Sequence, residues 1–231
     1  MRQTLGKVLL SLIAAWLLSA AIGCQKIQQM TGVGVIRPEK KMMLFNGKDF
    51  NGLERFIPDP AVNVDDVWQV KDGVIHCTGK PKGFLRTKSE YANYHLHVEW
   101  RWPNEPTNSG VLLHATSEKE VWPQCIEAQL KVGQAGDLVL MKGAGVAIYG
   151  QMHQDASKKY VVIPKRRPSS EQPPELWNVY DIYCKDDKIV LYVNGMLQNE
   201  GTKATETSGK ICLQSEGSPI EFRNIYVAPV Y

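Results

Sequence analysis

The sequence has few cysteines and no pair of them at CxxC spacing. Of five cysteines in 231 residues, four lie in the part of the chain that we expect to fold, at Cys77, Cys125, Cys184 and Cys212. Four cysteines allow three disulfide pairings, and the sequence leaves open both the pairing and the alternative of buried free thiols. The missing CxxC spacing argues against a zinc site built from cysteine.

Concentrated charge and helical periodicity are also missing. The formal net charge is only +3, the isoelectric point is near 8.5, and most basic residues are scattered. This pattern argues against nucleic acid as a partner. No long stretch after the N-terminal region repeats its apolar residues at helical spacing, so a parallel sheet covered by helices is disfavoured.

One long apolar run is present, at the N-terminus. Residues 8–22 are apolar and follow the basic Arg2 and Lys7. The run is too short and ends too abruptly for a confident membrane-spanning helix, and it is typical of a secretory signal. We therefore predict a signal peptide over residues 1–23.

The end of this run, Ala21-Ile22-Gly23-Cys24, resembles the bacterial lipobox. The resemblance implies lipidation of Cys24 and a membrane anchor in the cell envelope, with Gln25 favouring the outer membrane. Ala21 stands where leucine is usual, so ordinary cleavage and a retained anchor stay open. The polar residues 24–41 predict a tether, and residues 42–231 predict one folded domain.

Short strand patterns separated by turn residues fill this domain. From Tyr94 to Trp102, apolar and polar residues alternate with period 2. Asp72-Gly73 and Asn194-Gly195 are strong signals for tight hairpin turns. We therefore predict an all-β, lectin-like jelly-roll sandwich of two antiparallel sheets, preceded by the signal peptide and tether.

A single carboxylate interrupts an otherwise uncharged strand pattern, Ile126-Glu127-Ala128-Gln129-Leu130. With period 2, Glu127 and Gln129 share one face and the three apolar residues share the other. Glu127 is either a solvated residue on an exposed face or a group that lines a polar, ligand-binding surface of the sheet.

Six segments in one order resemble the 3-keto-disaccharide hydrolase family. They are LFNGKDFNGL at 44–53, WQVKDGVI at 68–75, EWRW at 99–102, NSGV at 108–111, IEAQL at 126–130 and FRNI at 222–225. The resemblance implies a concanavalin-A-like β-sandwich and cleavage of glycosides whose sugar ring bears a ketone at C3.

The implied chemistry is an elimination. The C3 ketone acidifies the C2 proton, so a general base can remove it, and the aglycone then leaves from C1 before water adds. This route requires a base near C2, a donor or cation at the developing oxyanion, and an acid or water at the leaving oxygen. It does not require the two opposed carboxylates of an ordinary glycosidase.

Glu127 is the first candidate for catalysis, as the base or as the ligand of a cation that polarises the ketone. A structural carboxylate is the alternative. His114 is the second candidate, because a neutral imidazole can accept a proton near neutral pH, although a histidine at a strand end is often a surface group.

Other polar and aromatic residues are candidates for binding the sugar. Hydroxyl groups of a sugar can be bound by short polar side chains at a turn, by amides on strands and by a cation. The faces of a pyranose can be covered by flat aromatic rings. Each also has a structural alternative: a plain turn, core packing, or an ion pair of Arg101 with Glu99 or Glu127. The candidates are Asn108, Ser109, Arg101, Gln129, Trp122, Tyr149, Trp177, Gln214 and Glu216.

No metal site is apparent from the sequence. His95 and His97 alternate on one strand face and resemble half of a site, but no third ligand stands at a fixed spacing, and a solvated face explains them as well. A divalent cation for the enediolate, held by Glu127 or Glu216, is a further possibility.

Three classes of function remain: an envelope-anchored enzyme acting on 3-keto-glycosides, a non-catalytic carbohydrate-binding lipoprotein, and a purely structural lipoprotein. For the enzyme, the family resemblance implies oxidoreductases in the same pathway that make and reduce the 3-keto sugar.

Overall fold

The computed structural model describes residues 34–116 and 120–231. The predicted signal peptide, Cys24 and most of the tether lie outside these residues. The compact unit of the described structure is Val35–Tyr231. The Ile36 amide donates to Glu90 O (2.9 Å) and Ile36 O accepts from the Ala92 amide (3.0 Å), so the end of the predicted tether pairs with the domain.

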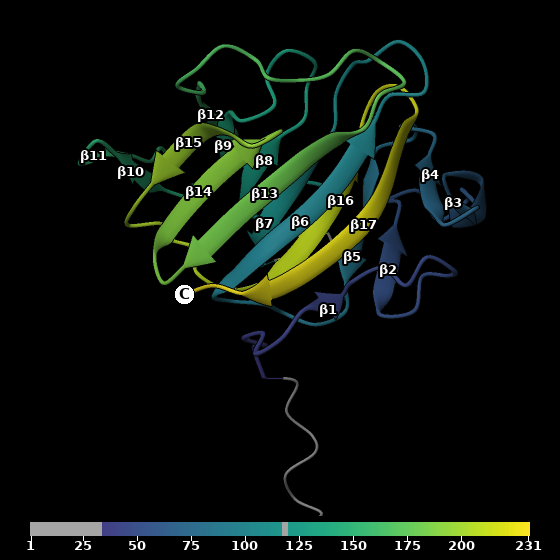
Figure 1. Ribbon diagram of the computed structural model, residues 1–231, viewed down its shortest axis with the longest axis horizontal. Coiled ribbons are helices and arrows are strands. Elements are labelled where there is room, and N and C mark those ends of the chain that lie inside the picture. The colour runs from purple at the N-terminus through teal and green to yellow at the C-terminus, as the bar shows by residue number, and fades with distance from the viewer. Residues whose placement is uncertain (1–33, 117–119) are drawn as a thin grey trace, which may run out of the picture. The chain divides into compact units, whose positions relative to one another are not determined.

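The predicted all-β sandwich is confirmed. The domain consists of two large sheets in which every described strand pair is antiparallel (Figure 1). In order across the eight-stranded sheet lie β15 (Met196–Gly201), β14 (Lys188–Val193), β13 (Asn178–Lys185), β6 (Tyr94–Arg101), β17 (Ile220–Pro229), β4 (Val74–Cys77) and β3 (Trp68–Lys71), with β1 (Met42–Met43) paired to β17.

The second sheet has seven strands and lies behind β13, β6 and β17 in Figure 1. Its order is β12 (Tyr160–Ile163), β9 (Leu138–Met141), β8 (Cys125–Gln129), β7 (Gly110–Ala115), β16 (Lys210–Ser215), β5 (Gly83–Thr87) and β2 (Leu53–Phe56). A small hairpin of β10 (Val146–Ile148) and β11 (Gln151–His153) and a 3-10 turn, η1 (Val64–Asp66), complete the domain.

Period-2 alternation explains how the sheets pack. Along β6, burial alternates residue by residue: Tyr94, Leu96, Val98 and Trp100 are fully buried, and the residues between them are half-buried. The inner faces of both sheets form one hydrophobic core. Packing of these inner faces drives the fold, because each fully buried large apolar side chain contributes on the order of 1.5–3 kcal/mol.

The two expected hairpin turns are present. Asp72 and Gly73 join β3 to β4 with φ of 52° and 77°, and Asn194 and Gly195 join β14 to β15 with φ of 49° and 76°. Consecutive positive φ values define a type I′ turn, which matches the twist of the flanking strands.

The open question of disulfide pairing is resolved in favour of free thiols. Cys77, Cys125, Cys184 and Cys212 are all buried and unpaired with one another. Burial raises the pKa of the Cys184 and Cys212 thiols to about 12. Within the described part of the chain, no helix has the length and hydrophobicity needed to cross a membrane.

Candidate active site

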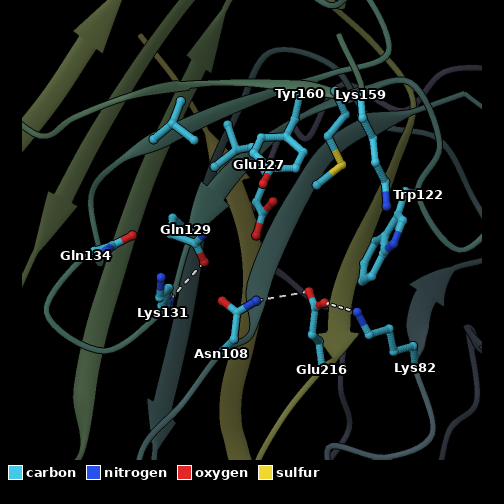
Figure 2. Close-up of a pocket in the computed structure, with 13 residues that line it drawn as sticks. Lys82, Asn108, Trp122, Glu127, Gln129, Lys131, Gln134, Lys159, Tyr160 and Glu216 are labelled. Carbon is cyan, nitrogen blue, oxygen red and sulfur yellow. Dashed lines mark hydrogen bonds and ion pairs between the residues drawn. The ribbon is translucent and has the colours of Figure 1, made fainter.

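A cavity of about 320 Å³ lies on the outer face of the seven-stranded sheet (Figure 2). Strands β8, β9 and β12 supply much of its wall, and the segments next to β5, β7 and β16 supply the rest. It is lined by Lys82, Asn108, Trp122, Glu127, Gln129, Lys131, Gln134, Val139, Met141, Lys159, Tyr160, Val162 and Glu216.

Glu127 occupies the middle of this cavity's sheet wall. The alternation expected for β8 is observed: Ile126 and Ala128 belong to the core, whereas Glu127 and Gln129 line the cavity. Glu127 is only 3% exposed, so the solvated-face alternative is excluded. Figure 2 shows its carboxyl group pointing into the space between Tyr160, Gln129 and Asn108.

The neighbours of Glu127 do not compensate its charge. Its cross-strand partners are Leu112 on β7 and Val139 on β9, and no described residue forms a hydrogen bond or ion pair with its carboxylate. Burial, with a smaller contribution from the negative charge of Glu216, raises the pKa of Glu127 from 4.5 to about 8. A carboxyl group that titrates near neutral pH in a cavity is suited to proton transfer.

Gly110 explains how the carboxylate fits. A Cβ atom at this position would lie 2.0 Å from Glu127 Oε1 and 3.0 Å from Gln214 Oε1. Real Cβ atoms do not approach other atoms as closely as 2.0 Å, so only glycine leaves room for the carboxylate here. Asn108, Gly110 and Glu127 therefore belong to one site.

Asn108, Glu216 and Lys82 form a polar network at the cavity's edge. Asn108 Nδ2 donates to Glu216 Oε2 (3.0 Å), and Lys82 Nζ lies 2.6 Å from Glu216 Oε1 (Figure 2). Asn108 Oδ1 is buried and has no hydrogen-bond partner among the described residues. The network fixes Glu216 and leaves one amide oxygen available to a ligand.

Two glutamines flank Glu127. Gln129 Oε1 accepts hydrogen bonds from the amides of Leu130 (2.9 Å) and Lys131 (2.8 Å), which fixes the side chain in the cavity wall. Gln214 is 1% exposed on β16, and its Oε1 has no partner in the described structure. Both residues lie where a ligand touching Glu127 would meet them.

The oxygen atoms near Glu127 fit a divalent cation. Glu127, Asn108 Oδ1 and Gln214 Oε1 offer the carboxylate and amide oxygens that hard cations prefer. Glu216 fits this role less well than expected, because both of its oxygens already bind Lys82 and Asn108.

Several residues of the cavity were not identified from the sequence. Trp122 is a cavity residue that the sequence did suggest. Tyr160 and Val162 were not suggested; they line the cavity from the exposed edge strand β12. Lys82, Lys131, Gln134 and Lys159 are ordinary surface residues by sequence pattern. Only the pairing of β12 with β9 brings the edge strand to the site.

His114 does not line the cavity, which corrects the prediction that it serves as a second base there. On β7, Leu112 pairs with Cys212 of β16 and Ala115 pairs with Lys210. Three steps along β7 therefore match two steps along β16, so β7 contains one extra residue, a bulge. With φ of 58° at this bulge, His114 turns away from the cavity and packs against Tyr94 in the core, 5.5 Å between ring centroids. Burial lowers its pKa to about 4.

Four expected sugar-binding residues also lie elsewhere. Arg101 is on the outer face of the other sheet, where its Nε donates to Glu221 Oε2 (2.5 Å) rather than to Glu99 or Glu127. Trp177 packs against the guanidinium groups of Arg101 and Arg223, at 4.7 Å and 4.0 Å from its ring centroid. Tyr149 is 83% exposed, and Ser109 is fully buried with its Oγ bonded to Gln214 O (2.9 Å).

The raised pKa of Glu127 predicts a pH dependence of stability. Between about 4.5 and about 8 the folded chain holds a proton that the unfolded chain has released, so the free energy of unfolding falls as pH rises through this window. Glu127→Gln removes this titration. The melting temperature of the variant should therefore rise relative to the unmodified chain between about pH 5 and about pH 9. A melting-temperature difference between the two proteins that stays constant from about pH 5 to about pH 9 would contradict the raised pKa of Glu127.

Residues 41–228 match the family model of the 3-keto-alpha-glucoside-1,2-lyase-like domain. The chain belongs to this family. The match spans both sheets and every residue of the cavity, and it confirms the resemblance noted in the sequence. No functionally curated protein matches the chain.

Solved structures agree with this membership. Two proteins from Parabacteroides distasonis ATCC 8503 that carry the provisional name glycosyl hydrolase align with TM-scores of 0.60. The first is 23% identical, and the alignment covers 83% of this chain and 100% of that protein. The second is 25% identical, and the alignment covers 84% of this chain and 95% of that protein. The carbohydrate-binding module CBM66 from Bacillus subtilis aligns with a TM-score of 0.52 at 7% identity over 75% and 93%, which shows the fold alone. The family and the relative at 25% identity support a carbohydrate-active, glycoside-acting enzyme.

Proposed function

We propose that this protein cleaves glycosides bearing a ketone at C3, with Glu127 as the base that removes the C2 proton. The observation behind the proposal is the carboxyl group of Glu127, which is buried in a cavity with no hydrogen-bond partner among the described residues and has its pKa raised to about 8. Membership in the 3-keto-alpha-glucoside-1,2-lyase-like family supports the substrate class.

The reaction proceeds in three steps. Glu127 accepts the C2 proton, and the electrons of the C–H bond move into the ketone to give an enediolate. The enediolate collapses to form a C1–C2 double bond as the C1–O bond breaks, and the aglycone oxygen takes up a proton. Water then adds at C1, so that the net change is hydrolysis. A base with a pKa near 8 is a better proton acceptor than an ordinary carboxylate.

The other cavity residues suit the remaining tasks. The Gln129 amide and the ammonium groups of Lys131 and Lys159 line the cavity and are the available donors for the negatively charged oxygen at C3. The rings of Trp122 and Tyr160 supply flat apolar surfaces for the C–H faces of a pyranose. In the alternative role of Glu127, as a ligand rather than the base, Glu127, Asn108 and Gln214 would hold a divalent cation that polarises the ketone when bound.

We further propose that the mature protein is a lipoprotein anchored through Cys24 in the cell envelope, at the outer membrane. The support is the signal-like run before Cys24 and its lipobox-like end. Oxidoreductases that form the C3 ketone and later reduce it are the partners that this substrate requires.

A non-catalytic carbohydrate-binding lipoprotein is the second candidate. It is favoured by the aromatic residues at the cavity's edge, and its fold is one that a carbohydrate-binding module also adopts. A binding protein has no use for the ketone, and it would bind an unoxidised sugar at least as well as the 3-keto form.

The test is a comparison of two substrates. The folded unit from Val35 onward is incubated with a 3-keto-disaccharide and with its unoxidised parent, with and without EDTA, and products are followed by mass spectrometry. Selective cleavage of the keto sugar supports the enzyme, and a loss with EDTA adds a cation. Binding of both sugars without turnover would favour the binding module instead.

A further inference from the structure

A second cluster of chemically active side chains lies on the outer face of the eight-stranded sheet. His95 and His97 project from β6, and Asp181 lies directly across from His97 on the neighbouring β13. His95 Nε2 and His97 Nδ1 both donate to Asp181 Oδ1, each at 2.8 Å. The pairing of the two strands thus supplies the third ligand that the sequence did not reveal.

We propose that His95, His97 and Asp181 bind a divalent transition-metal ion such as Zn²⁺. Two imidazoles and one carboxylate are ligands that Zn²⁺ takes in proteins, with water completing the coordination. The three ligand atoms all lie within 4.8 Å of one another, and their side chains are half-buried. The site therefore has the right chemistry and remains open on one side to water.

The observed spacing is close to that of a loaded site. With ligand bonds of about 2.0–2.1 Å, neighbouring ligand atoms around a tetrahedral zinc ion lie roughly 3.3 Å apart. The two nitrogens lie 2.8 Å from the carboxylate oxygen. An outward shift of about half an ångström, with loss of the two shared protons, admits the metal.

Stacked rings hold both imidazoles in place. His95 lies parallel to Tyr183, with 4.4 Å between ring centroids and 6° between planes. His97 stacks on Tyr226 in the same way, at 4.6 Å and 13°. Fixed imidazoles lose little conformational freedom when a metal binds, which favours binding.

A second carboxylate supports His97 from behind. His97 Nε2, the nitrogen that does not face Asp181, lies 3.7 Å from Glu99 Oε1. Metal-bound histidines commonly direct their other nitrogen at a carboxylate, which orients the ring and strengthens the ligand. Arg223 and Asn224 hold Glu99 in turn, at 2.6 Å each, and Lys41 lies over the outer face of Tyr226.

This cluster is separate from the candidate active site. Leu96 and Val98 alternate with the two histidines and point into the core, so the histidines face away from the other sheet. Glu127 faces away from the core on the opposite sheet. The two sites thus lie on opposite outer faces of the sandwich, and metal binding can be measured whether or not the cavity cleaves 3-keto-glycosides.

The experiment measures metal binding directly. The full chain, purified in detergent, is stripped with EDTA, exchanged into buffer and titrated with ZnCl₂ by calorimetry and with CoCl₂ by absorption. We expect one strongly bound ion per chain whose binding depends on His95, His97 and Asp181, and no thiolate-to-cobalt band, because the ligands are nitrogen and oxygen. His97→Gln and Asp181→Asn should each weaken binding by roughly 10-fold or more.

His76→Gln is the matched control. His76 lies on β4 of the same sheet with Nδ1 3.0 Å from Glu221 Oε1, but it has no second histidine in its cluster. We expect the His76→Gln variant to bind Zn²⁺ with the same affinity as the unmodified chain. Equal affinity in His97→Gln, or no binding by a chain with native near-ultraviolet circular dichroism, would overturn the proposal.

A nuclear magnetic resonance measurement on the unmodified chain tests the proposal even if the variants fail to fold. The ring-proton resonances of His95 and His97 should shift on addition of ZnCl₂, while those of His114 in the core stay in place. Unchanged His95 and His97 resonances would also overturn the proposal.

Discussion

Glu127→Gln is expected to lower kcat/KM for a 3-keto-glycoside by roughly 10²- to 10⁴-fold, the range that a general acid or base contributes. Glutamine has the shape of a protonated glutamate, and Glu127 lies between the apolar residues Leu112 and Val139 of the neighbouring strands without an ion pair, so the fold should tolerate the change. The affinity for the substrate should change little, because the amide keeps the polar surface of the carboxyl group. Steady-state kinetics together with binding measurements on the variant check both parts.

Glu200→Gln is the control for this result. Glu200 also lies on a strand, but it pairs with Lys188 and Arg166 away from the cavity, and we expect its variant to keep full turnover. Turnover of Glu127→Gln within a factor of a few of the unmodified enzyme would show that another group removes the C2 proton.

Gly110→Ala is expected to lower turnover by about 10²-fold without changing any polar group. The new methyl group would lie 2.0 Å from Glu127 Oε1 and 2.7 Å from Glu127 Cδ, so the carboxylate must move by about an ångström. A displacement of that size at a catalytic group costs on the order of 10²-fold in rate. The check is kcat for the alanine variant, alongside circular dichroism to confirm that the strand pairing is intact.

The double variant Gly110→Ala, Glu127→Gln tells whether the glycine acts through the carboxylate. If it does, the second substitution adds little to the loss caused by Glu127→Gln alone, because residues in contact are not additive. Independent, multiplying losses would instead mean that Gly110 matters for substrate approach or for β7 itself.

Regular alternation made parts of the site predictable from the sequence. The period-2 pattern around Glu127 placed it with Gln129 on the polar face of β8, and both line the cavity. Period 2 alone would put His114 on the same face as Leu112, toward the cavity, but a single extra residue in β7 reverses the direction of the side chains that follow it. A bulge is fixed by pairing with β16, and the sequence of β7 alone has no signal for it.

The aromatic and basic candidates show a second limit. Trp122 lines the cavity, whereas Trp177 and Arg101 lie on the outer face of the other sheet. Period 2 tells which side of its own strand a residue faces, but both sheets have an outer face. The sequence does not state which of the two a residue occupies, since that depends on the order of strands across the sandwich.

The sequence by itself determined the family, the all-β class, the hairpin turns and the inward and outward faces of the strands, because these depend on local spacing and turn chemistry. Only the tertiary structure decided which polar groups meet. Glu127 is enclosed by residues of β7 and β9 and reaches the cavity only because Gly110 makes room. His95 and His97 gain Asp181 across 86 and 84 residues of chain. These contacts join segments far apart in the sequence, and they exist only once the strands have paired in register.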